Sequence, residues 1–196
     1  MRFVEHEQRV FVRADVDERG HVMFQKRRFE LSAADRVKFP DAKPKEMRQY
    51  ARVNPRGVWY LKRDVEVHRP ATRSYFAGLL FNLPRLLADP PRVALTEGEK
   101  DAQAVTAAGV TALSHWGGAG HFTAEQAEQL RGYKGLILLS ADDDGPGYAD
   151  VVRRYDRLRA VGIATGQLRP LLPRSGKDAA DALEKLPLRQ ALRRVP

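Results

Sequence analysis

The sequence contains no cysteine among its 196 residues. Disulfide bonds, thiolate zinc sites and thiol chemistry are therefore excluded, and a reducing compartment is permitted. Apolar runs are short. None approaches the roughly 20 residues of a membrane-spanning helix, and the first residues, MRFVEHE, have no apolar signal-peptide core. We therefore expect a soluble, cytoplasmic protein with no membrane partner.

Basic residues outnumber acidic ones, and the excess lies in the first half of the chain. Residues 1–90 contain 19 Lys and Arg against 12 Asp and Glu, residues 91–196 contain 15 against 13, and the formal net charge is +9. A basic half beside an acid-centred half indicates a polyanion surface next to a metal site. On charge alone, a basic protein without such a partner is an equal alternative.

Residues 136–147, LILLSADDDGPG, are an apolar run that ends in three carboxylates and a turn. Such a run is typical of a strand buried on both faces. The carboxylates must leave the sheet for water or for cations, and alternation along an extended chain points Asp142 and Asp144 the same way. The pair predicts a clamp for Mg²⁺ or Mn²⁺. The alternative is a solvated acidic turn.

The first 30 residues carry the pattern of a β-hairpin. Alternating apolar and polar residues at 9–15 and 21–30 flank the turn sequence DERG at 17–20. Period two places Lys26 and Arg28 on one face of the second strand. The alternative to a nucleic-acid contact for these two residues is that they are solvated side chains at the end of a strand.

The rest of the first half is less regular. Prolines and mixed charges at 32–57 and 63–73 predict irregular structure, interrupted by an extended segment at Trp59. Apolar spacing at 75–87 predicts a short helix or two. The sequence DPP at 89–91 predicts a boundary between a smaller, basic, β-rich α+β subdomain at 1–90 and a second domain at 91–196.

The second half alternates strands with helices, which predicts an α/β fold with a parallel four-stranded sheet flanked by helices. The expected strands are 92–96, 110–114, 136–141 and 163–172, and the expected helices are 99–108, 123–131, 148–161 and a tail from 178. Function in such a sheet gathers at the carboxyl ends of the strands. Glu97, Asp142, Asp144 and Asp178 all follow strands, so we expect them at one edge, where cations could hold them together.

Four motifs in this order resemble the TOPRIM domain of phage and plasmid primases and primase-helicases. They are TEGEKDA at 96–102, GGAG at 117–120, ADDDGPG at 141–147 and GKDAAD at 176–181. The resemblance covers residues 92–185. A looser resemblance joins the first half to the small subdomain that precedes TOPRIM in those primases.

The resemblance implies roles for individual residues. Glu97 matches a metal ligand or general base, Asp142 and Asp144 match paired metal ligands, and Asp178 matches the later aspartate that helps to hold a second ion. Residues implied to approach nucleotide or phosphate are Gly98, Gly117, Gly118, Gly147 and Lys177. Lys26 and Arg28 are candidates for template or triphosphate contacts.

The implied activity is that of a DNA primase, a DNA-directed RNA polymerase that makes short RNA primers on single-stranded DNA with two Mg²⁺ or Mn²⁺ ions. Its implied partners are single-stranded DNA, ribonucleoside triphosphates, a separate replicative helicase and a zinc-binding module. This chain departs from the pattern because it has no cysteine for such a module. The alternatives are a metal-dependent TOPRIM nuclease and a nucleic-acid-binding module without turnover.

Several further residues leave alternatives open. Glu99 and Asp101 could orient Glu97 or could be solvated helix acids. His115 and His121 flank the glycine motif and could be metal ligands. No third soft ligand lies nearby in the sequence, so a glycine loop that passes close to phosphate is favoured. Arginines spread around the expected helix at 148–161, which indicates solvated side chains. They are Arg153, Arg154, Arg157 and Arg159.

Overall fold

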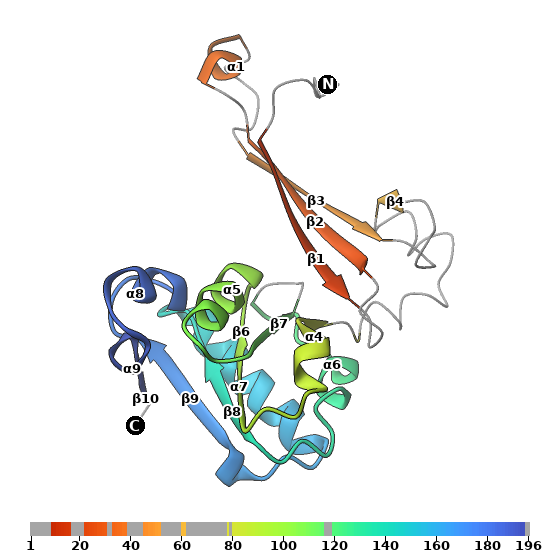
Figure 1. Cartoon of the computed structure of the whole chain (residues 1–196), viewed down its shortest axis with the longest axis vertical. Coiled ribbons are helices and arrows are strands. Elements are labelled where there is room, and N and C mark those ends of the chain that lie inside the picture. The colour runs from red at the N-terminus through yellow and green to blue at the C-terminus, as the bar shows by residue number, and fades with distance from the viewer. Residues whose placement is uncertain are drawn as a thin grey trace.

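The computed structural model describes residues 9–16, 22–30, 33–38, 45–51, 60–61, 78, 80–115 and 119–194, and for the strands before residue 62 it describes the backbone alone. These residues form a four-stranded and a six-stranded sheet. The smaller sheet extends away from the larger sheet and its helices (Figure 1), and β1 of the smaller sheet contacts β5 and α4 of the larger unit. In the described part of the chain, no helix is long and apolar enough to cross a membrane.

The smaller sheet contains the predicted hairpin. Strands β1 (Arg9–Val16) and β2 (Val22–Glu30) pair antiparallel, with Arg9 opposite Glu30. The prediction of irregular structure at 32–57 is wrong. This region contains α1 (Ala33–Lys38) and β3 (Lys45–Ala51). The local sequence pattern of β3 is weak. The strand forms because its backbone pairs with β2, which is a contact that the local sequence does not predict. The short β4 (Tyr60–Leu61) completes the sheet, while Trp59 and residues 63–73 lie outside the described residues.

The larger sheet confirms the expected α/β architecture. Its strand order is β10-β9-β8-β6-β7-β5, and the four strands from β9 to β7 in that order are parallel. The strands are β5 (Leu80–Phe81), β6 (Arg92–Thr96), β7 (Ala112–His115), β8 (Leu136–Ser140), β9 (Leu168–Pro173) and β10 (Leu192–Arg194). The helices are α4 (Leu83–Leu86), α5 (Glu99–Ala107), α6 (Ala124–Glu128), α7 (Gly145–Ala160), α8 (Ala179–Lys185) and α9 (Leu188–Ala191).

The parallel strands are buried on both faces, as the apolar runs predict. Val93, Leu95 and Leu139 pack into a core with residues of α6 and α7, whereas Ala94 and Leu138 pack into a second core with residues of α5, α8 and α9. Alternation along each strand therefore divides the side chains between two apolar layers. Polar side chains can leave this arrangement only at the strand ends.

Some boundaries differ from those read off the sequence. Helix α7 begins three residues earlier than expected because Asp144 caps it and Pro146 occupies its first turn. Strand β9 is shorter than 163–172, because a 3-10 turn at Thr165–Gln167 precedes it. The tail also does not stay helical: β10 returns antiparallel beside β9, with Leu192 opposite Pro173.

Buried leucines of the larger sheet should dominate its stability. Leu139 of β8 is fully buried, whereas Leu87 after α4 is 60% exposed. We expect Leu139→Ala to lower the free energy of unfolding by about 2–5 kcal/mol, because it removes apolar contacts and leaves a cavity. The matched change Leu87→Ala should cost less than about 1 kcal/mol. Urea unfolding measures both values, and equal losses would contradict the placement of β8 in the core.

Candidate metal centre

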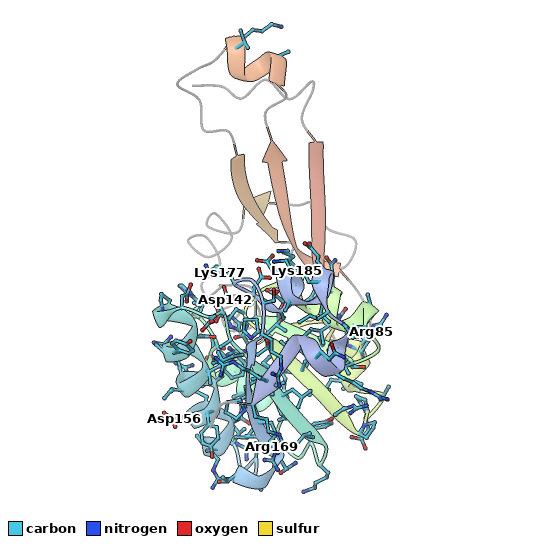
Figure 2. The ribbon with its side chains drawn as sticks, turned by 90° about the vertical axis from the view of Figure 1, so that its left-hand side faces the viewer. Arg85, Asp142, Asp156, Arg169, Lys177 and Lys185 are labelled. Carbon is cyan, nitrogen blue, oxygen red and sulfur yellow. The ribbon has the colours of Figure 1, made fainter. Side chains whose placement is uncertain are left out.

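The predicted acids lie at a topological switch point of the larger sheet. From β6 the chain passes to β7 on one side and then returns to β8 on the other, so β6 is a neighbour of both. The carboxyl ends of strands at such a reversal border a crevice in open α/β sheets. Glu97 directly follows β6, and Asp142 and Asp144 follow β8. Figure 2 shows Asp142 and Lys177 at the end of the larger unit nearer the smaller sheet, and Asp156 and Arg169 at the opposite end.

Glu97 is a buried carboxylate held against the segment after β8. Only 8% of the residue is exposed, and its Oε1 accepts a hydrogen bond of 3.2 Å from the backbone N–H of Asp142. Burial raises the pKa of Glu97 to about 7, and the negative charges of Asp142 and Asp150 add to the rise, while the Asp142 amide and Arg154 oppose it. Glu97 therefore changes protonation state near neutral pH.

Asp142 and Asp144 share one ammonium group, as their predicted common direction requires. The Nζ of Lys177 lies 3.7 Å from Oδ2 of Asp142 and 3.0 Å from Oδ2 of Asp144. Burial and the charge of Asp178 raise the pKa of Asp142. The hydrogen bond from Gly147 and the contact with Lys177 lower the pKa of Asp144. Asp143 points elsewhere and accepts a hydrogen bond from the Tyr148 hydroxyl.

Asp144 and Asp178 are built alike, because each caps a helix with one oxygen and meets a lysine with the other. Oδ1 of Asp144 accepts the Gly147 N–H at the start of α7, at 2.8 Å. Oδ1 of Asp178 accepts the Asp181 N–H at the start of α8, at 2.7 Å, while its Oδ2 lies 3.3 Å from Nζ of Lys100. The cap fixes the orientation of each carboxylate and leaves one oxygen for a cation.

Asp101 belongs to the same group of acids. From the sequence alone, a solvated helix acid was an equal alternative for this residue. It is buried in α5 and accepts a hydrogen bond of 2.9 Å from the N–H of Ala180. Burial raises the pKa of Asp101 to about 6, and the charges of Asp178 and Asp142 contribute to the rise. The available signal was its place in the first turn of the helix that directly follows Glu97.

The remaining predicted residues divide into three sets. Gly147 packs into the acid group: a Cβ there would lie 2.4 Å from the Asp142 carbonyl oxygen and 2.9 Å from Oε1 of Glu97. Gly98 is the N-cap residue of α5. Gly117 and Gly118 lie outside the described residues. Lys26 and Arg28 occur in β2, opposite Arg13 and Phe11, but their side chains are not among those described, so their contacts remain predictions.

Two residues behind the site, Arg154 and His115, are fully buried, and only for Arg154 did the sequence predict a solvated side chain. The prediction that Arg154 is solvated is wrong. Its side chain is 0% exposed and lies on the inner side of α7. His115 is equally buried, and its Nε2 lies 3.4 Å from Oδ2 of Asp150. Burial alone would raise the pKa of Asp150, but the hydrogen bond with His115 and the charge of Arg154 outweigh it and lower that pKa. The sequence signal for Arg154 was the spacing Asp150-x-x-x-Arg154 on a helix with an apolar face.

The donor set fits a hard divalent cation. Several carboxylates from separate segments repel one another at one edge, and two of them already hold a cationic group between them in the form of the Lys177 ammonium. Carboxylate oxygens are the ligands that Mg²⁺ and Mn²⁺ prefer. Within the described ranges, no three acidic or histidine side chains are close enough to form a ready-made metal cluster.

The fold is that of DNA primase catalytic cores. The E. coli primase catalytic core superposes with a TM-score of 0.61 at 16% sequence identity, over 92% of this chain and 50% of that chain. The zinc-binding and RNA polymerase domains of Aquifex aeolicus primase superpose with a TM-score of 0.62 at 15% identity, over 91% of this chain and 37% of that chain. This chain therefore spans half or less of the length of either protein.

A phage structure has the same fold. A chain from the structure of bacteriophage T7 lagging-strand DNA polymerase, which interacts with primase domains of two gp4 subunits, superposes with a TM-score of 0.54 at 18% identity. The match covers 91% of this chain and 72% of that chain. No family model and no curated protein sequence matches this chain. At these identities the likeness establishes the fold, and the chemistry must be argued from the residues.

The close approach at Gly147 makes a sharp test of the site geometry. We expect Gly147→Ala to lower the free energy of unfolding by about 1–3 kcal/mol, because the new methyl group meets the Asp142 backbone. Gly145→Ala, in the same first turn of α7, is the control, since a Cβ there meets nothing within 4 Å. That change should be neutral or stabilising, because alanine favours helix. Urea unfolding compares the two, and an equally benign Gly147→Ala would contradict this geometry.

The raised pKa of Glu97 predicts a pH-dependent stability. Glu97 titrates near pH 7 in the folded protein and near 4.5 in the unfolded chain, so the folded state binds the extra proton between these values. Stability from this group is complete below about pH 4.5 and is lost as the pH rises through about 7. Relative to wild type, Glu97→Gln should gain up to about 3 kcal/mol between pH 4.5 and pH 8.

Urea unfolding in EDTA at several pH values measures this difference. Asp101 titrates in an overlapping window and in the same direction, but it is present in both proteins, so its contribution cancels in the comparison. If the free energies of unfolding of wild type and Glu97→Gln changed with pH in the same way, Glu97 would have to be solvated in the folded state.

Proposed function

We propose that this chain is the catalytic core of a DNA primase, which synthesises short RNA primers on single-stranded DNA by metal-dependent nucleotidyl transfer. The observation that carries the proposal is the combination of the primase-core fold with carboxylates at the carboxyl ends of β6 and β8. The ordered TOPRIM-like motifs supply those carboxylates. On this proposal, residues 91–196 form a TOPRIM catalytic domain and residues 1–90 a basic subdomain for template and nucleotide.

The proposed roles follow from the environment of each acid. Asp142 and Asp144 would hold one cation with the oxygens that now meet Lys177, and Asp178 would help to hold a second. When bound, two Mg²⁺ or Mn²⁺ ions would stabilise the attacking 3′-hydroxyl and the departing pyrophosphate. Glu97, with a pKa of about 7, is suited to ligate a cation as a carboxylate or to accept the hydroxyl proton on a side-chain oxygen.

Cationic and glycine residues complete the proposed nucleotide site. Lys177 is 63% exposed and can turn from the carboxylates to a phosphate. Gly147, Gly98, Gly117 and Gly118 would let backbone approach nucleotide phosphates. Lys26 and Arg28 would contact template or triphosphate from β2, since the smaller sheet lies toward the same end of the larger unit as Asp142 (Figure 2).

The proposed partners are a replicative helicase and a zinc-binding module provided outside this sequence. The solved Aquifex protein combines zinc-binding and RNA polymerase domains. This sequence has no cysteine to build a thiolate zinc site. A role in phage or plasmid replication is proposed on the resemblance of the four motifs to primases of that type, and the solved relatives include both phage and bacterial proteins.

A primer-synthesis assay tests the proposal directly. The protein is incubated with single-stranded DNA, labelled ribonucleotides and Mn²⁺, with a helicase and a zinc module from a related replication system added in parallel. We expect labelled primers from wild type and a loss of at least about a hundredfold in Asp142→Asn/Asp144→Asn, since metal coordination contributes several kcal/mol to such transition states.

The matched control is Asp143→Asn, which removes a carboxylate from the same turn without touching the pair that meets Lys177. It should retain primer synthesis within a few-fold of wild type. Shortened template without primers would identify a TOPRIM nuclease instead. Retention of single-stranded DNA with no product under any condition would identify a binding module and overturn the proposed activity.

A further inference from the structure

A buried ion pair lies beneath the candidate metal centre. Arg154 and Asp150 are four residues apart on α7, both side chains are 0% exposed, and Nε of Arg154 lies 2.8 Å from Oδ2 of Asp150. Transferring two charges into a protein interior is costly, and replacing such a pair by apolar residues is often neutral or stabilising. A contribution to stability therefore does not explain why a charged pair occupies this buried position. The other groups that Arg154 and Asp150 bind indicate its role.

Arg154 joins the ends of the two central strands. Its Nη1 donates a hydrogen bond of 2.6 Å to the carbonyl oxygen of Leu95 in β6, and its Nη2 donates one of 2.8 Å to the carbonyl oxygen of Ser140 in β8. These carbonyls precede Glu97 and Asp142 by two residues each. A planar guanidinium with fixed donor directions therefore spans the strands exactly where they release their carboxylates.

Asp150 extends the same network to the third strand end. Its Oδ1 accepts a hydrogen bond of 2.6 Å from the N–H of Gly120, and its Oδ2 lies 3.4 Å from Nε2 of His115, the last residue of β7. Gly120 closes the glycine motif that follows β7. One buried pair thus connects the carboxyl ends of β6, β7 and β8, from which predicted site residues emerge.

We propose that the Arg154–Asp150 pair is a positioning device that sets the spacing between the Glu97 and Asp142 carboxylates and holds the backbone at Gly120. This inference rests on the proposed function, because the spacing matters for a divalent cation. Neither residue touches the reacting atoms. Both act through the backbone that carries the ligands. Loss of groups hydrogen-bonded directly to metal ligands commonly changes metal affinity by 10–100-fold, and that range gives the scale of the effect expected here.

The test separates cation binding from folding. Mn²⁺ binding is measured by electron paramagnetic resonance titration, and stability by urea unfolding, for wild type, Arg154→Met/Asp150→Leu, Arg154→Lys and Arg157→Met. The double variant replaces the pair by apolar side chains, whereas lysine keeps the charge but lacks the planar donor arrangement. Arg157→Met is the matched control, because Arg157 lies on the same helix and is partly exposed.

We expect the double variant to stay folded but to unfold at a lower urea concentration than wild type, because the Leu95 and Ser140 carbonyls and the Gly120 N–H lose a buried partner. We also expect it to bind Mn²⁺ at least tenfold more weakly. Arg154→Lys should remain folded and lose affinity to a smaller extent, and Arg157→Met should match wild type. Unchanged Mn²⁺ affinity in the folded double variant or in Arg154→Lys would overturn the inference. Failure of both to fold would also overturn it, because the pair would then be a requirement of the fold itself.

The same titration distinguishes this inference from the proposed function. Wild type that binds Mn²⁺ but makes no primers would overturn the primase activity, and the affinities of the variants would still decide the positioning role. Wild type that binds no Mn²⁺ would overturn both. Normal primer synthesis with equal Mn²⁺ affinity in all folded variants would leave the proposed function standing and remove the positioning role.

Discussion

The pairing of β6 with β8 is the constraint on which the site depends. These parallel strands run in register from Arg92 opposite Leu136 to Leu95 opposite Leu139. That register brings Glu97 beside the Asp142 amide. A slip of one residue would exchange the two faces of β8 and turn its apolar side chains into the wrong core layer. The packing of two apolar layers thus determines which carboxylates meet, although none of these acids takes part in that packing.

Local backbone chemistry then orients the acids that register brings together. Asp144 and Asp178 each commit one oxygen to a helix N-terminus, where an unpaired N–H and the helix dipole both favour a negative charge. Gly147 lets the first turn of α7 approach Asp142 and Glu97 more closely than any side chain would permit. The acids are therefore oriented mainly by groups of the backbone, with cations on the open side.

The sequence predicted the larger sheet well, because its signals were local and strong. The strand at 92–96 matches β6 exactly, and apolar runs ending in acids placed Glu97 and Asp142 at one edge. Charges whose partners are distant in sequence were harder to predict. The spacing of Arg154 from Asp150 is a local signal for that one partner, but the carbonyl of Leu95, which Arg154 also binds, lies 59 residues away and no local pattern predicts it. Strands β3, β5 and β10 were missed for the same reason, since each is defined by the strand beside it, and β5 at Leu80–Phe81 replaces part of the helix predicted at 75–87.

The cations around the acids differ in whether they can leave. Arg154 is fully buried and bonded to two carbonyls and a carboxylate, so its removal would strand a buried charge and unpaired acceptors. Lys177 and Lys100, in contrast, have side chains 63% and 48% exposed, and exposed ion pairs contribute only about 0–1 kcal/mol. An incoming divalent cation or a phosphate can displace these lysines at little cost while the arginine stays in place. The acid group thus combines one buried cation with two exposed ones, which holds the carboxylates together and, on the proposed function, leaves room for a metal to replace the lysines.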